Sequence, residues 1–185
     1  PGNLNGSHTE VLAAVLAEEA VKGVDLAIDL HGGGSWCVNS FAFVMPGGGA
    51  ISAAFGAPFS AQAPERAVTL TGHARSLGAT VAAIEMGGRG EQEDAWAERI
   101  AAGLRRALVI AGVLRSSGDD APPQVSIPVG GTTVLRPKQG GMFVPRLGVD
   151  AVGTIVPQGT VLGELLDPAT LAVREQLTAP FERTA

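Results

Sequence analysis

The order of helix, glycine and strand constrains the fold of this chain more than any other feature. A capping box at Ser7 and Glu10 opens an apolar, helically periodic segment that runs to about Lys22. The spacing predicts a helix that ends at Gly23, directly before residues 24–30, which have the short length and apolar content of a buried strand. A helix that passes into a buried strand through one glycine is typical of α/β proteins.

The same pattern continues to about residue 115 and then stops. We expect further strands over residues 41–45 and 79–85, and helices from residue 64 to about 77 and from 91 to about 110. Residues 116–124 form a turn-rich linker, and beyond it short segments of Val, Ile, Leu and Thr alternate with Gly, Pro or Asp. We therefore expect a partial α/β domain over residues 1–118 and a small β-rich module over residues 119–185.

Composition and charge exclude several classes of partner. A hydrophobic fraction of 45% with 17% charged residues is typical of a globular protein. The net charge is −5 and the chain has only two lysines, so we expect neither nucleic-acid nor membrane binding, but a small or neutral partner. A single cysteine excludes an internal disulfide framework, and no apolar run approaches membrane-spanning length, so we expect a cytoplasmic protein.

Two of the expected strands end in chemically useful residues. His31 follows the first strand and precedes three glycines, and Glu85 ends a later strand before the segment MGGRG. Ligands bind at the carboxyl ends of strands in open α/β sheets, so the two side chains meet if these strands are neighbours. A histidine and a glutamate at one place suit a zinc ligand and a general base.

Each of these residues also has a simpler interpretation. A lone histidine at a strand end is most often structural, and Glu85 also suits a solvated loop carboxylate. Asp25 and Asp29 are candidate acceptors for the second nitrogen of His31, or charges at a strand edge. Arg89 is a candidate clamp for a substrate carboxylate, with a solvated loop arginine as the alternative.

The other two histidines of the chain do not supply the further ligands that a metal site needs. A catalytic zinc takes three protein ligands, whereas His8 and His73 form no H-x-x-E or H-x-x-x-H pair. Either the chain holds no metal, or the missing ligands lie upstream of residue 1. Cys37 is a weak candidate for a nucleophile, and we expect a buried structural thiol there.

Four segments resemble the succinylglutamate desuccinylase and aspartoacylase family of the zinc carboxypeptidase-like superfamily. They are PGNLNGSHTEVLAAVL, VDLAIDLHGGG, GATVAAIEMGGRG and GGMFVPRLGVDAVGTIVPQGTVLGELLDP, and their order and spacing match across essentially the whole chain. The segments AFGAP and ARSLGATVAAIEMGGRG are most similar to the N-acyl diamino acid deacetylase branch. The resemblance implies a mixed sheet flanked by helices, which is a partial zinc carboxypeptidase-like fold, followed by a small all-β module.

The resemblance also implies a function. His31 would be the third zinc ligand and Glu85 the general acid/base of a deacylase that cleaves the amide bond of an N-acyl amino acid. The family's H-x-x-E and asparagine-arginine segments are absent, so we expect that the chain begins inside a longer polypeptide and also stops early at its C-terminus. The alternatives are a non-catalytic binding or carrier-like fragment and an inactive homologue, and a homo-oligomer is compatible with either class.

Overall fold

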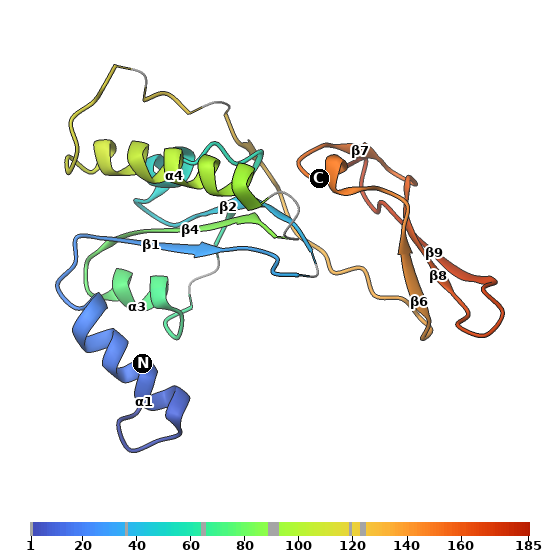
Figure 1. Ribbon diagram of the computed structural model, residues 1–185, viewed down its shortest axis with the longest axis horizontal. Helices are drawn as coiled ribbons and strands as arrows, with labels where there is room; N and C mark the ends of the chain where they lie inside the picture. Colours follow the sequence, from blue (N-terminus) through green and yellow to red (C-terminus); the bar gives the residue numbers. More distant parts are fainter. Residues whose placement is uncertain (1, 36, 64–65, 89–92, 119, 123–124) are drawn as a thin grey trace. The chain divides into compact units, whose positions relative to one another are not determined.

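The computed structural model describes residues 2–35, 37–63, 66–88, 93–118, 120–122 and 125–185 (Figure 1). The chain divides into two compact units, residues 1–128 and 129–185. The sequence-based boundary lies at residues 118/119, and the first unit extends past it because a short strand, Ile127–Pro128, pairs with the sheet of that unit. None of the helices in the described ranges is long and apolar enough to cross a membrane.

The first unit contains a five-stranded mixed sheet in the order β1-β4-β2-β3-β5. Its strands are β1 (Leu26–His31), β2 (Asn39–Val44), β3 (Phe59–Gln62), β4 (Thr80–Gly87) and β5 (Ile127–Pro128). Strand β4, between β1 and β2, runs parallel to β1 and antiparallel to β2, while β2, β3 and β5 are parallel to one another. The mixed α/β architecture expected from the sequence is confirmed.

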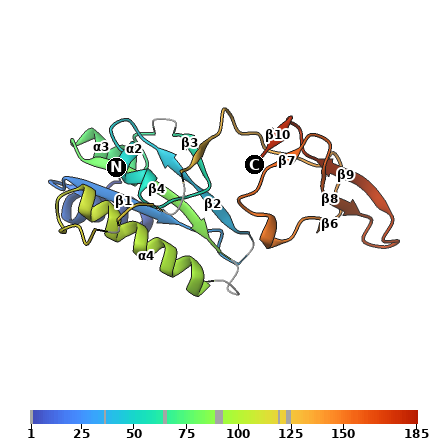
Figure 2. The ribbon, with the colours of Figure 1, turned by 90° about the horizontal axis from the view of Figure 1, so that it is seen from above.

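Helices cover both faces of this sheet. They are α1 (His8–Leu16), which continues as the π-helical turn η1 (Ala17–Val21), α2 (Gly49–Ala53), α3 (Leu70–Ser76) and α4 (Glu93–Ile110). Figure 1 shows α3 on one side of the sheet and α4 on the other, and α4 runs along β4 in both ribbon views (Figure 2). The capping box of the first helix is present, because Ser7 accepts from the Glu10 backbone and its own N–H donates to the Glu10 carboxylate.

The sequence did not predict two short elements and placed one boundary wrongly. A helix was expected from residue 64; residues 64 and 65 lie outside the described residues, and residues 66–69 are not helical. Helix α3 begins at Leu70, where the Thr69 hydroxyl accepts from the Gly72 N–H and caps it. Helix α2 and strand β3 have five and four residues, and α2 begins within a glycine run that is typical of a turn. Elements this short have too few residues to show a period.

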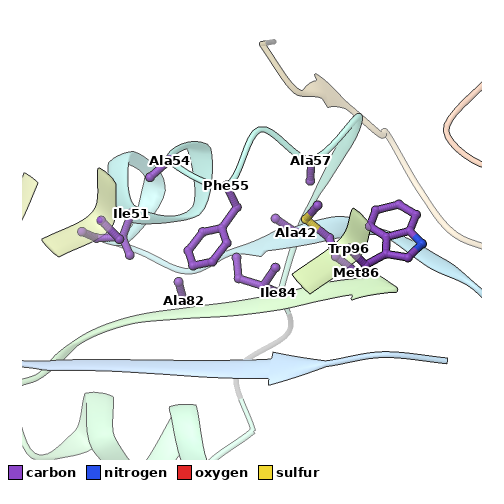
Figure 3. Packing of buried hydrophobic residues seen from close by; sticks show 10 residues of the cluster. Ala42, Ile51, Ala54, Phe55, Ala57, Ala82, Ile84, Met86 and Trp96 are labelled. Carbon is purple, nitrogen blue, oxygen red and sulfur yellow. The ribbon is translucent and has the colours of Figure 1, made fainter. Parts of the chain in front are cut away.

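Strand β4 is buried on both faces and separates two apolar clusters. The larger cluster lies between the sheet and helices α2 and α4, and Figure 3 shows its packing around Phe55. Its buried members are Ala42, Ile51, Ala54, Phe55, Ala57, Ala82, Ile84, Met86, Trp96 and Ala107. The smaller cluster contains Val21, Ala74, Ala79 and Val81. Since side chains alternate along a strand, Glu85 lies on the same face of β4 as Val81.

The second unit is a small antiparallel β module. Strands β6 (Met142–Pro145), β8 (Val161–Leu166) and β9 (Val173–Thr178) form a sheet in the order β6-β8-β9, and β7 (Val156–Pro157) pairs with β10 (Arg183–Thr184). A single 3-10 turn, η3 (Val149–Ala151), lies between β6 and β7. The buried Glu164 in the central strand accepts from Gln176 at 2.9 Å and pairs with Arg146, which satisfies its charge.

Asp167 accepts several hydrogen bonds in the turn between β8 and β9, and these contacts make the stability of the fold depend on pH. Its Oδ1 accepts from the backbone N–H groups of Thr170 (3.0 Å) and Ala169 (2.8 Å), and its Oδ2 accepts from Arg174 Nε (3.0 Å). These donors, the Thr170 N–H first among them, lower the pKa of Asp167 to about 2. A carboxylate with a lowered pKa stabilises the fold above its ordinary pKa of 3.8, and that contribution is lost as the pH falls toward 2.

We therefore expect Asp167→Asn to lower the melting temperature at neutral pH, because the amide loses the ion pair with Arg174. The difference in melting temperature between the variant and the parent should become smaller as the pH falls from about 4 to about 2. Calorimetry across this range measures it, with Glu182→Gln, an exposed carboxylate of the same unit, as the control. A difference in melting temperature that stays constant with pH would contradict the lowered pKa of Asp167.

Candidate active site

The ends of β1 and β4 bring His31 and Glu85 together. The two strands are parallel neighbours, and His31 lies opposite Glu85 in the register. His31 Nδ1 is 4.0 Å from Glu85 Oε1. Parallel neighbours end at the same edge of a sheet, and residues opposite one another project from the same face. The structure therefore places the two sequence-predicted residues side by side.

The other ring nitrogen of His31 contacts Asp29. Nε2 lies 3.0 Å from Asp29 Oδ1, two residues earlier on the same face of β1. A carboxylate oxygen accepts hydrogen bonds, so the contact with Asp29 suits an N–H on Nε2, and Nδ1 is the ring nitrogen on the Glu85 side. Of the two aspartates considered from the sequence, Asp29 makes this contact. The His31 side chain is 53% exposed, so its free nitrogen is accessible.

Glu85 is held from the opposite side by a residue that the sequence did not single out. Its Oε2 accepts from Asn39 Nδ2 at 2.7 Å, and the Glu85 side chain is only 19% exposed. Asn39 begins β2, which is the antiparallel neighbour of β4. No local pattern marks Asn39, because only the pairing of β2 with β4 brings it near Glu85.

Glycines allow close packing between the loop that connects β1 to β2 and the segment after β4. The Gly33 N–H donates to Gly87 O at 2.9 Å and connects the loop after β1 to the end of β4. A Cβ on Gly33 or Gly88 would lie 2.0 or 2.1 Å from the Cys37 carbonyl oxygen, and Gly88 has a φ of +129°. Gly33 and Gly88 are therefore required for the close approach of these two segments.

The Cys37 thiol is exposed, which contradicts the expectation of a buried structural thiol. The thiol lies 3.5 Å from the carbonyl oxygen of Gly33 in the loop that connects β1 to β2. The expectation was wrong because it rested on the general tendency of free cysteines to be buried.

Comparison with solved structures identifies the fold. No family model and no curated protein sequence matches the chain. The product-bound ectoine utilization protein EutE from Ruegeria pomeroyi superposes with a TM-score of 0.74 at 24% identity over 97% of this chain and 56% of that protein. A succinylglutamate desuccinylase from a Silicibacter species gives a TM-score of 0.78 at 22% identity, covering 98% of this chain and 57% of that one. An aspartoacylase family protein from Mesorhizobium loti gives 0.76 at 23% identity, with coverages of 98% and 57%.

This chain has an aspartoacylase-like fold. The likeness extends over nearly the whole chain, which spans 56–57% of the length of these three structures. The resemblance stated from the sequence motifs is thus confirmed at the level of the fold.

The residues of this aspartoacylase-like fold fit one ligand position of a metal site. His31 has an accessible nitrogen and a carboxylate on its other nitrogen, the arrangement usual for metal-binding histidines. No group of three His, Cys, Asp or Glu side chains suited to a metal occurs within the ranges that the structure describes. His8 begins α1 and His73 lies in α3, so neither completes such a group there. Arg89 lies outside the described residues.

Proposed function

We propose that this chain is part of a zinc-dependent deacylase of the succinylglutamate desuccinylase and aspartoacylase family. The substrate would be an N-acyl amino acid or a similar small amide. One observation carries the proposal: an imidazole and a carboxylate, oriented by Asp29 and Asn39, face each other at 4.0 Å at the edge of the sheet. The aspartoacylase-like fold and the matching motifs support the same assignment.

His31 is the residue that would hold the zinc ion, through Nδ1, while Asp29 keeps the ring oriented through Nε2. We propose that two further protein ligands lie N-terminal to Pro1. When bound, zinc supplies Lewis-acid polarisation of the acyl carbonyl and activation of water. An isolated chain of these residues is expected to bind zinc weakly, since a catalytic site needs three protein ligands.

Glu85 is the proton-transfer group of the proposed reaction. Its Oε1 is directed toward His31, so it can take a proton from a water beside the imidazole. The water oxygen forms a bond to the acyl carbon, the amide C–N bond breaks, and Glu85 delivers the proton to the leaving amine. The products are a carboxylic acid and a free amine. We propose that Arg89, which follows β4 in the sequence by two residues, binds the carboxylate of the substrate.

The non-catalytic alternative receives no specific support. A biotinyl or lipoyl carrier presents its lysine at the tip of a hairpin, whereas Lys138 lies in a bend between β5 and β6, which belong to different sheets and form no hairpin. The backbone N–H of Lys138 donates to the Glu175 carboxylate, which ties this bend to β9. An inactive homologue remains as the competing outcome of the experiment below.

Zinc analysis of the whole protein, together with a panel of N-acetyl and N-succinyl amino acids, tests the proposal. We expect about one zinc ion per chain, and turnover of at least one panel member that a chelator removes and added zinc restores. Absence of zinc and of turnover for every panel member would contradict the proposal and favour the inactive homologue.

A further inference from the structure

We propose that Asn39 is a positioning residue that anchors one oxygen of the Glu85 carboxylate and reserves the other for proton transfer. The inference rests on the proposed role of Glu85 and goes beyond it, because it assigns separate tasks to the two oxygens. Oε2 is the anchored oxygen and Oε1 the reactive one.

The register of the sheet explains why Asn39 can reach Glu85. Strand β2 runs antiparallel to β4, with Phe41 opposite Glu85. Asn39 is two residues before Phe41, so it projects from the same face of the sheet as Glu85 and lies diagonally across from it. The contact is therefore built into the pairing of two strands rather than into a loop.

The contacts distinguish the two carboxylate oxygens. Oε2 accepts from Asn39 Nδ2 at 2.7 Å, a short distance typical of a charge-assisted hydrogen bond. Oε1 faces His31 Nδ1 at 4.0 Å, which is outside hydrogen-bond distance. One oxygen is thus held by the protein, and the other stays available to a water molecule or a substrate group.

An asparagine suits this task because its amide stays neutral and keeps its donors at every working pH. When Oε1 carries the transferred proton, Oε2 still has lone pairs, so the Asn39 hydrogen bond persists through the reaction. The Oδ1 atom of Asn39 lies 3.9 Å from Cys37 Sγ, whose thiol donates toward it. Because a carboxylate only accepts, the 2.7 Å contact with Glu85 orients the amide with its nitrogen toward Glu85.

The test compares Asn39→Ala with Ser40→Ala in the whole protein. Ser40 is the next residue of the same strand, and its buried hydroxyl has no hydrogen-bond partner within the described ranges, so its removal controls for damage to β2. We expect Asn39→Ala to lower kcat by about 10- to 100-fold, because displacing a reacting group by about one ångström can lower the rate by about 100-fold. KM, zinc content and the kcat of Ser40→Ala should stay within about twofold of the parent.

Asn39→Asp should lower kcat at least as far, because it sets a second carboxylate against Glu85. A kcat for Asn39→Ala within about twofold of the parent would overturn the proposal. A parallel loss of zinc would also overturn it, since Asn39 would then support the metal site rather than Glu85.

A crystal structure of the Asn39→Ala variant separates this inference from the proposed function. We expect the Glu85 carboxylate to leave its position opposite His31 once its anchor is removed. A Glu85 side chain that keeps its position would overturn the inference even if the enzyme is active. If the whole protein hydrolyses no acyl amino acid, the proposed function fails, and the structure of the variant still decides whether Asn39 positions Glu85.

Discussion

If Glu85 has the proposed role, its replacement by Gln is expected to lower kcat of the whole protein by about 10²- to 10⁴-fold, the range typical of a lost general acid or base. Glutamine has nearly the same shape and keeps an oxygen that can accept from Asn39. It neither takes a proton from water nor delivers one to the leaving amine. Zinc content should therefore be unchanged, and metal analysis beside steady-state kinetics measures both quantities.

Two further variants serve as comparisons for Glu85→Gln. His31→Ala should lose zinc and turnover together, because it removes the proposed ligand itself. Glu93→Gln, which changes an exposed carboxylate at the start of α4, should leave kcat unchanged. Loss of zinc in Glu85→Gln would show that Glu85 is a ligand, and the proton-transfer role would be wrong.

Truncation of Phe55 to alanine is expected to lower the free energy of unfolding of the first unit by about 3–5 kcal/mol. Phe55 is 1% exposed and lies between α2 and β4, next to Ile84 (Figure 3). A Cβ on Gly103 of α4 would lie 2.5 Å from the Phe55 ring, which shows how closely α4 approaches it. The truncation leaves a cavity that this tight packing cannot close.

Denaturant unfolding followed by tryptophan fluorescence measures this change, because both tryptophans of the chain belong to the first unit. Val68→Ala is the control, since Val68 is 85% exposed and its truncation should change the free energy of unfolding by less than about 0.5 kcal/mol. A loss below about 1 kcal/mol for Phe55→Ala would contradict the packing around this ring.

The elements that the sequence predicted well are those with a strong local signal. The helix at the N-terminus has a capping box and ends near Gly23, and β1 and β4 are short apolar runs that end at polar residues before glycines. Helix α2 and strand β3 have no such signal. Asn39 was missed for a different reason, since an asparagine at the start of a strand has no feature that links it to a glutamate 46 residues later.

Local sequence alone determined that an imidazole and a carboxylate stand where two apolar strands end, because burial and glycine breaks act over a few neighbouring residues. Only the tertiary structure decided that these strands are parallel neighbours in register, and that β2 runs antiparallel beside β4. Strand pairing depends on contacts between residues far apart in the chain. The positions of Asp29 against His31 and of Asn39 against Glu85 therefore follow from the assembled sheet.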